Sequence, residues 1–434
     1  MAGYPLSSLE PDSASQEVPE ALQAPTQPVS KGFVTALTAA NLVIWISVLP
    51  VLQLLLPEQV GAIDPVHKTL NLGIVTSIGA FISLIANPIV GALSDRTSSR
   101  LGRRRPWILV GALLSALALA LLWKASTIVA LVIGWSLMQL FSNFLQAATT
   151  AIVPDRIPAS QRGTITGLVS MATPLGAILG VILIGQVLKS IDISYLFLIA
   201  LVLVFLLPYT FFLREKVLPR GYLPPFRLGT FLKNFWINPQ AYPDFGWAWL
   251  ARFIVMLGYA SATGYTYYYL QDAIHYTRLF PGQTIAQGSS LLSLFSVVFL
   301  ILSTIVGGML SDRFQRRKLF VIIASVIMAL ALFLMGFFPS WPVVIVATCL
   351  QGVGFGCYLA VDFVLVTLVL PSEGDRGKDL GILNIANSLP QSLAPLMAGI
   401  VLSLTHNSYL IMFVMAGLIT LAGAFLVQPI RSVR

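Results

Sequence analysis

Two opposite charges stand inside segments that are otherwise apolar. Asp362 lies about nine residues before Pro371, roughly 13 Å along a helix, and Arg252 lies several residues inside another segment. Charges are costly away from water unless they pair, so we predict an ion pair between Arg252 and Asp362. Arginine favours the carboxylate and burial favours the neutral acid, so an opening pair can exchange a proton. The alternatives are a purely structural pair, or an Arg252 that extends to the end of its segment.

Neutral polar residues recur at helical spacing in several of these segments. One face carries Gln139, Asn143 and Gln146, and another carries Gln351, Tyr358 and Asp362. We predict that both faces look into a polar interior, with Asn41 and Gln53 as weaker candidates in the first segment. For a third stripe we expect hydrogen bonds between helices instead. That stripe consists of Asn384, Asn387 and Gln391.

The chain that positions these residues cannot form an ordinary water-facing surface. Hydrophobic residues make up 57% of the sequence and charged residues 10%, against about 25% charged in a soluble domain. From Gly32 onward, apolar runs long enough to cross roughly 30 Å of hydrocarbon as helices alternate with short polar breaks. We predict twelve membrane-spanning helices, at 32–56, 69–93, 107–123, 127–152, 163–188, 194–213, 246–271, 286–310, 318–338, 342–370, 381–404 and 408–428.

Lysine and arginine gather on one side of the predicted spans. The other side carries only Lys68, Lys124, Lys189 and Arg278, so the positive-inside rule places both termini in the cytoplasm. The proline-rich stretch 214–245 is the one long connection. It predicts a cytoplasmic linker between a six-helix half at 32–213 and a second at 246–428. The expected cytoplasmic tails are 1–31, disordered and not a signal peptide, and 429–434.

Five tyrosines fall in or near the seventh predicted span. They are Tyr259, Tyr265, Tyr267, Tyr268 and Tyr269. Such rings can stack on the C–H face of a solute while their hydroxyls bond its polar edge. For Tyr267 to Tyr269 we favour the alternative, an aromatic belt at the outer membrane interface.

The two halves repeat the same short motifs. Gly91-Ala-Leu-Ser-Asp95-Arg96 recurs as Gly308-Met-Leu-Ser-Asp312-Arg313. A second echo pairs Val153-Pro154, followed by Arg162-Gly163, with Leu370-Pro371, followed by Arg376-Gly377. Parallel repeats of six spans are typical of transporters whose halves rock around a site near the membrane midplane.

Gly91-x-Leu-x-Asp95-Arg96, with Gly102-Arg103-Arg104-Arg105 behind it, resembles the signature loop of the major facilitator superfamily. The longer string 94–107 resembles its sucrose and glycoside transporter branch. The resemblance implies an all-α fold of twelve membrane helices in two halves. It also implies that Gly91 lets two helices approach closely, and that Asp95 and Asp312 latch the cytoplasmic side against a helix N-terminus and basic residues. The implied gate residues are Gly91, Asp95, Arg96, Gly102, Arg103, Arg104, Arg162, Asp312, Arg313 and Arg376.

For Arg100 and Arg103 to Arg105, an equal alternative is that they only keep the loop in the cytoplasm.

Within that family the expected activity is secondary transport by alternating access. Amides, tyrosines and one ion pair suit a neutral, hydroxyl-rich solute such as a sugar or glycoside. The second span has Asn71 and Asn87 but no aspartate, so the sodium site of melibiose-type relatives has no ligands, and we expect a proton as coupling ion. The candidate residues for solute and proton are Arg252, Asp362, Gln351, Tyr358, Tyr259, Gln139, Asn143, Gln146 and Asn41.

Other classes of function remain as alternatives. Gly167, Pro174, Gly176 and Gly180 loosely resemble a motif of drug or metabolite efflux carriers, although Thr173 departs from it. A transport-inactive sensor or assembly factor is a further alternative. We expect no enzyme, no cofactor and no metal site, because the three histidines are too scattered and Cys349 and Cys357 lie in one apolar stretch. The expected partners are the solute, a proton and the lipid bilayer, without nucleic acid; we expect a monomer in a bacterial plasma membrane.

Overall fold

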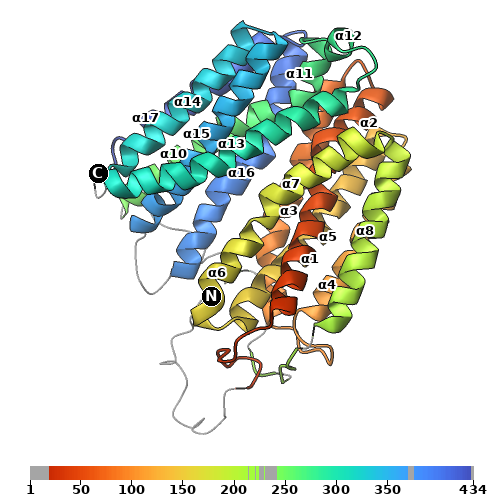
Figure 1. The fold of residues 1–434 in the computed structure, drawn as a ribbon, viewed down its shortest axis with the longest axis vertical. Coiled ribbons are helices and arrows are strands. Elements are labelled where there is room, and N and C mark those ends of the chain that lie inside the picture. Colours follow the sequence, from red (N-terminus) through yellow and green to blue (C-terminus); the bar gives the residue numbers. More distant parts are fainter. Residues whose placement is uncertain are drawn as a thin grey trace.

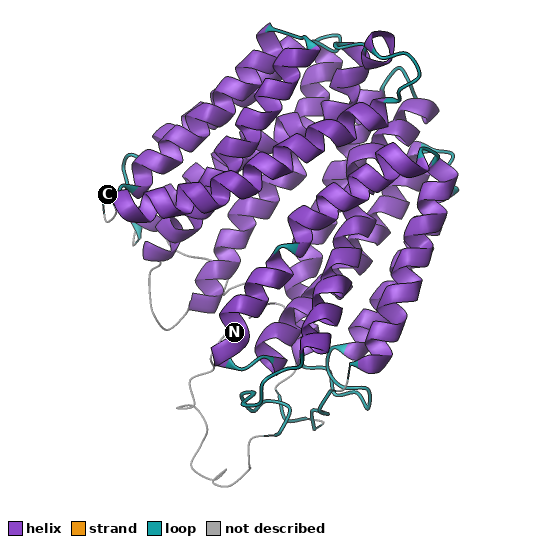
Figure 2. Cartoon of the chain, viewed as in Figure 1, coloured by secondary structure: helices purple, strands orange, loops and turns teal. Residues whose placement is uncertain are grey.

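A computed structural model of the chain describes residues 19–213, 215–219, 221–223, 229, 242–369 and 376–431; of residues 376–381 it describes only the backbone. Across these ranges the regular structure is helical, with no strand (Figure 2). Most of the predicted tail 1–31 and linker 214–245 lies outside the described residues.

The first part of the chain crosses the bundle six times. Two of these crossings contain π-helical stretches, Val51–Leu55 and Leu183–Leu188, which continue the helices before them. The α-helices are α1 (Lys31–Pro50), α2 (Leu56–Ile63), α3 (Lys68–Asp95), α4 (Arg105–Trp123), α5 (Ile128–Arg156), α6 (Ala159–Ser170), α7 (Ala172–Ile182) and α8 (Ile191–Phe212).

The second part repeats this course. It contains α10 (Pro243–Thr263), α11 (Thr266–Asp272), α12 (Tyr276–Leu279), α13 (Ile285–Phe314), α14 (Arg317–Phe337), α15 (Trp341–Leu368), α16 (Arg376–Leu404) and α17 (Tyr409–Phe425). In the described chain, eleven helical runs are long and apolar enough to span a membrane, and the 17 residues of α17 reach the lower limit for a crossing. The predicted segments are thus confirmed. The seventh differs, because it breaks at Gly264 into α10 and α11.

The helices pack into two groups (Figure 1). In the first group α3 and α4 lie against α5, α4 against α8, and α1 against α7; in the second, α13 and α14 lie against α15, and α10 and α14 against α17. Between the groups, α3 contacts α16 and α7 contacts α13. Each group therefore has its own packing, and these two helix pairs make the most extensive contacts between the groups.

Small residues allow the close approach of α15 to α13. A Cβ atom at Gly352 or Gly356 would collide with the carbonyl oxygen of Ser296 or Leu300. The Thr304 hydroxyl lies 2.7 Å from the carbonyl of Leu300 in its own helix and 3.2 Å from that of Gly356 on α15, so its proton is shared between the two. In lipid, where apolar surface gains little by leaving the solvent, such van der Waals packing and interhelical hydrogen bonds hold helices together.

The two ends of the bundle differ in charge and in how the groups meet. We call the end with the loops at 96–104, 157–158, 213–219 and 315–316 the basic end, and the end with the loops at 64–67, 124–127, 273–284, 338–340 and 405–408 the far end. Between described residues, the hydrogen bonds and ion pairs that join the two groups all lie in the far half of the bundle.

Hydroxyl groups of Tyr265, which directly precedes α11, and of tyrosines within α11 form part of this junction. The Tyr265 hydroxyl lies 2.6 Å from the carbonyl oxygen of Pro395 and 3.0 Å from that of Thr69. Tyr268 donates to the carbonyl of Pro57 at 2.8 Å, and Tyr269 to that of Met335 at 2.6 Å. Tyr268 and Tyr269 are fully buried, so the predicted aromatic belt is wrong for both. Their hydroxyls are used inside the protein rather than at a lipid headgroup.

Glycines bring α3 and α16 together at the same level. A Cβ at Gly73 would lie 2.7 Å from the carbonyl oxygen of Pro395, and one at Gly399 would lie 2.8 Å from that of Thr69. Toward the basic end the same pair of helices is looser, since no described atom lies within 4 Å of a Cβ built at Gly91. The close approach implied for Gly91 is therefore absent from this structure.

Gly356→Ala is expected to lower the thermal unfolding temperature in detergent by several degrees. The added methyl group meets backbone of α13 that cannot move aside, and such overpacking typically costs about 1–3 kcal/mol. Gly308→Ala is the matched control, because its Cβ would meet only the Cβ of Ala360 at 3.8 Å. Equal stability of the two variants would contradict the packing described here.

Tyr268→Phe is expected to increase the fraction of molecules in which the far ends of the two groups are separated, because the Tyr268 hydroxyl donates across the junction to the carbonyl of Pro57. One lost hydrogen bond of about 0.5–1.5 kcal/mol corresponds to a roughly two- to tenfold change in that ratio. The distance between two spin labels, one on each group, measures this ratio. Tyr269→Phe is the control, since its bond to Met335 stays within the second group, and it should leave the ratio unchanged.

Candidate functional site

The predicted ion pair between Arg252 and Asp362 is confirmed. The Nη1 atom of Arg252 on α10 lies 3.2 Å from the Oδ2 atom of Asp362 on α15, and the two side chains are 12% and 6% exposed. Seven residues toward the far end on each helix, after Arg252 on α10 and before Asp362 on α15, Tyr259 stacks on Phe355 with ring centroids 4.0 Å apart and planes 9° from parallel. The stack and the ion pair together fix the register of α10 against α15.

Polar atoms of α10 and α15, the two helices that carry this pair, retain unused hydrogen-bonding capacity. Among the described residues, the Nε2 atom of Gln351, the hydroxyl of Tyr358 and the Nε atom of Arg252 are buried without a hydrogen-bond partner. Gln351 is 7% exposed and Tyr358 1%. An unsatisfied buried polar group costs roughly 1–3 kcal/mol, so each of these atoms is available to bind a polar molecule.

The polar residues of the first group are used differently. The amide nitrogen of Asn143 donates to the hydroxyl of Ser83 at 2.8 Å, and its oxygen accepts from Asn87 at 2.8 Å. Asn41 donates to the carbonyl of Leu37 and accepts from the Thr149 hydroxyl at 3.5 Å. Asn143 thus holds α5 against α3, whereas the shorter bond of Asn41 stays within its own helix. Helical spacing alone did not distinguish this role from contact with a solute.

Gln139 and Gln146, from the same predicted face, are half-buried.

The polar stripe on α16 also differs from its prediction. Asn384 and Gln391 are exposed and Asn387 is half-buried, and none of the three makes a side-chain hydrogen bond with a described residue of another helix. The expected interhelical bonds are therefore wrong. Exposed amides on a spanning helix are unfavourable against lipid, so this face of α16 is best placed against water.

A buried arginine organises the loop between α3 and α4. Arg104 is 2% exposed, and its guanidinium lies 2.5 Å from Asp95, 2.9 Å from Asp155 and 2.8 Å from the hydroxyl of Ser94. Arg103 adds a second ion pair to Asp155 at 3.0 Å. The loop is thereby attached to the basic ends of α3 and α5.

Glu215, just after α8, closes this network from the other side. Its Oε2 atom accepts from the backbone N–H groups of Arg104 at 2.8 Å and Arg105 at 3.2 Å. Gly102 has φ 98°, and a Cβ there would collide with Glu215, so this position needs glycine for two reasons. Burial raises the pKa of Glu215 above its ordinary 4.5, against the opposing effect of the two N–H groups.

Sequence reasoning missed both acidic partners of the loop. Asp155 directly follows the repeated Val153-Pro154, and that position was the available signal. Glu215 stands in the predicted linker, where no pattern marks it.

The other implied gate residues are dispersed. Asp95 is 55% exposed, and its ion-pair partner Arg104 belongs to the same helix group. In the repeated loop Asp312 is 71% exposed and lies 3.8 Å from Arg317. Among the remaining residues, Arg96 donates to the carbonyl of Ala92, Arg162 donates to that of Ile157, Arg313 is exposed, and the side chain of Arg376 is outside the described part.

Glu215→Ala is expected to expose the amides of Arg104 and Arg105 to hydrogen exchange, because it removes their acceptor at a cost of roughly 1–3 kcal/mol. Glu215→Gln keeps an acceptor oxygen and should retain the protection. The raised pKa favours the protonated acid in the folded state, so the stabilisation is complete below pH 4.5 and is lost as the pH rises through the folded-state value. Glu215→Gln should flatten that dependence; an unchanged slope would contradict this assignment.

The sequence profile of the Major Facilitator Superfamily matches residues 33–295 and 281–433. The chain is 27% identical to the sucrose transport protein SUC3 of Arabidopsis thaliana over 149 residues, which cover 28% of this chain and 25% of that protein. It is 30% identical to the general alpha-glucoside permease of Schizosaccharomyces pombe over 121 residues, covering 24% and 22%. It is 31% identical to the multidrug resistance protein MdtG of Dickeya zeae over 176 residues, covering 40% and 41%. The chain thus spans less than half the length of each.

Solved structures share the fold over most of the chain. A bacterial homolog of the human lysosomal transporter Spinster, in an inward-facing and unoccupied conformation, has a TM-score of 0.68 at 15% identity and covers 93% of this chain and 99% of that one. The nucleoside transporter NupG has a TM-score of 0.69 at 14% identity and covers 92% and 99%. With the profile match across both helix groups, the chain belongs to the Major Facilitator Superfamily and is a multi-pass membrane transporter rather than an enzyme.

Proposed function

We propose that this transporter carries a small neutral solute rich in hydroxyl groups, a sugar or glycoside, by proton-coupled alternating access. The observation that carries the proposal is the buried Arg252–Asp362 pair, with the unused donors of Gln351 and Tyr358 on the same helix. The sugar carriers among the relatives support the solute class.

The charge of the site favours a neutral solute. Arg252 is paired with a carboxylate at 3.2 Å, so little positive charge is left to attract a phosphate or a carboxylate. The Gln351 amide and the Tyr358 hydroxyl can instead donate to and accept from solute hydroxyls. The stacked rings of Tyr259 and Phe355 lie beside them and provide a flat apolar surface of the kind that sugar C–H faces contact.

Proton coupling is proposed to reside in Asp362. While Arg252 holds it, the carboxylate is favoured, and when the pair opens, burial favours the neutral acid. A solute hydroxyl that engages the Arg252 guanidinium would release Asp362 to accept a proton. Binding of the solute and of the proton would then favour each other, as symport requires.

The arrangement of the two groups supports an inward-open state. The groups are joined in the far half. The exposed amide of Asn384 lies toward the basic end and that of Gln391 near the middle of α16, and the lysine and arginine distribution assigns the basic end to the cytoplasm. The bacterial relative matches a longer segment than the plant and yeast relatives, which supports a bacterial plasma membrane.

Asp362→Asn is expected to reduce proton-driven sugar accumulation in proteoliposomes by about tenfold or more, because the amide keeps the shape of the side chain and cannot take up the proton. Solute exchange without a gradient should persist and shows that the protein is folded. Asp192→Asn, which changes an exposed carboxylate at the far end of α8 and keeps an acceptor oxygen for Trp123, is the control. Gradient-driven uptake that survives Asp362→Asn would remove this residue from coupling.

The second candidate function is proton-driven efflux of drugs or metabolites. The multidrug resistance protein gives the longest match among these relatives. The glycines that resembled the efflux motif pack α7 against α1: a Cβ at Gly176 would lie 2.6 Å from the Cβ of Trp45, and one at Gly180 would lie 2.5 Å from Pro50. Gradient-driven expulsion of lipophilic cations from the same proteoliposomes, without sugar uptake, would favour efflux.

A further inference from the structure

An ion pair between the two helix groups lies at the far end, well away from the proposed solute site. The Nζ atom of Lys68, the first residue of α3, lies 2.7 Å from the Oδ1 atom of Asp272 on α11. It lies 3.2 Å from the amide oxygen of Gln271 and 4.9 Å from the ring centroid of Tyr268. An ammonium group from one half is thus bound by a carboxylate, an amide oxygen and an aromatic face from the other.

The three groups that hold this ammonium belong to a single short helix. Tyr268, Gln271 and Asp272, which we call the α11 site, stand at positions i, i+3 and i+4 and therefore share one helical face. Tyr409 on α17, in the same helix group, donates to the other carboxylate oxygen of Asp272 at 2.8 Å. The carboxylate is positioned by its own half of the protein, so the α11 site does not need Lys68 to form.

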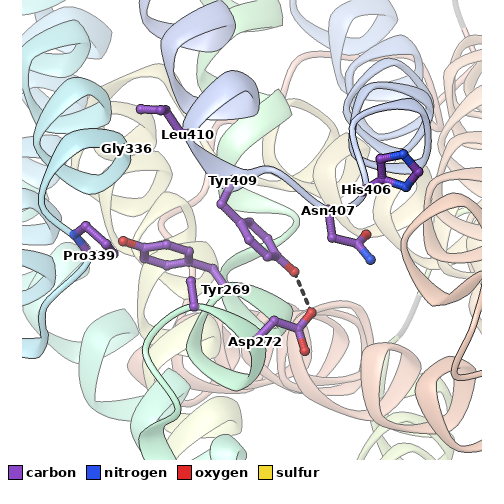
Figure 3. Close-up of a pocket in the computed structure, with 9 residues that line it drawn as sticks. Tyr269, Asp272, Gly336, Pro339, His406, Asn407, Tyr409 and Leu410 are labelled. Carbon is purple, nitrogen blue, oxygen red and sulfur yellow. Dashed lines mark hydrogen bonds between the residues drawn. The ribbon is translucent and has the colours of Figure 1, made fainter.

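The α11 site also borders a cavity. Next to Asp272 the structure has a hollow of about 370 Å³, lined by Tyr269, His406, Asn407 and Tyr409 among others (Figure 3). The Asp272 side chain is 26% exposed and that of Lys68 is 13% exposed. A small ligand therefore has a route to the carboxylate from the far side.

We propose that the α11 site binds a small ammonium cation from the far side, in competition with the ammonium group of Lys68. Lys68 occupies the site while the two halves meet at the far end. When they part, as the halves of a carrier of this family do in alternating access, Lys68 leaves with α3 and the site becomes available. A carboxylate beside an aromatic face and an amide oxygen is suited to a primary ammonium ion, which has three donors and a compact charge.

A ligand that binds only the far-end-open state shifts the protein toward that state. At ten times its dissociation constant for the open form, the ratio of open to closed molecules rises about tenfold. The proposal does not depend on the solute that is carried. If ethylammonium changes far-end opening in a protein that shows no sugar transport, the α11 site is supported while the proposed solute class fails.

The test measures the distance between spin labels at Val129→Cys on α5 and Leu279→Cys on α12, which are 68% and 53% exposed. The full chain is used, with Cys349→Ser and Cys357→Ser removing the native thiols. Ethylammonium chloride is titrated at constant pH and ionic strength. Tetramethylammonium chloride, which has no N–H donor, is the control, and sodium chloride and a pH series are separate arms.

The spin-labelled protein with Lys68 and its Lys68→Ala variant should respond to ethylammonium with opposite sign. With Lys68 present, ethylammonium should increase the far-end-open population. Lys68→Ala should begin with more open molecules, because closure leaves the Asp272 carboxylate without its counter-charge. Ethylammonium should then fill the space of the missing ammonium and favour closure. Asp272→Asn should abolish both responses.

Several outcomes would overturn the proposal. One is that the protein with Lys68 and the Lys68→Ala variant respond to ethylammonium with the same sign, or that neither responds. This comparison does not require the Asp272→Asn variant to fold. A response that Asp272→Asn retains, or that tetramethylammonium reproduces, would assign the effect to ionic strength or to another site. Opening by sodium or by acid alone, without an effect of ethylammonium, would assign the site to a metal cation or a proton.

Discussion

Hydrocarbon offers no hydrogen-bond partner, and the arrangement of polar groups in this protein follows from that constraint. Backbone groups are satisfied within helices, and buried side chains such as Asn143 and Tyr268 donate to atoms of neighbouring helices. Against this background the Arg252–Asp362 pair stands out, because it places two charges inside the bundle. Evolution rarely leaves such groups inside a membrane protein without a use.

The sequence could predict features that depend on local pattern and on depth. Helix positions followed from segment length, and the pairing of Arg252 with Asp362 followed from two opposite charges at matching depth in helices that this fold makes neighbours. The direction in which a side chain points around its helix was harder to predict. Asn143 and Asn384 both occur in polar stripes, yet the first is buried between helices and the second is exposed. Their difference comes from the tilt and neighbours of α5 and α16, which no spacing rule encodes.

The repeated loops illustrate a second limit. Ser-Asp-Arg occurs at matching positions in both halves, but Asp95 belongs to a network around a buried arginine while Asp312 is 71% exposed, with a single partner at 3.8 Å. Their surroundings differ because the first loop draws on Asp155 and Glu215, which stand far from it in sequence. Similar motifs therefore do not imply similar contacts, since among the described residues the two loops have unlike partners.

The bond from Glu215 to the loop before α4 also bears on how the protein is made. The Arg104 amide and its acceptor are 111 positions apart, and the acceptor stands directly after the last helix of the first group. A ribosome adding about 5–20 residues per second needs on the order of 5–20 s to cover that interval. The hydrogen bond from the loop to Glu215 can therefore form only after all six membrane crossings of the first group have been synthesised. Completion of this one contact marks the moment at which the first half can become a finished unit, before any helix of the second has left the ribosome.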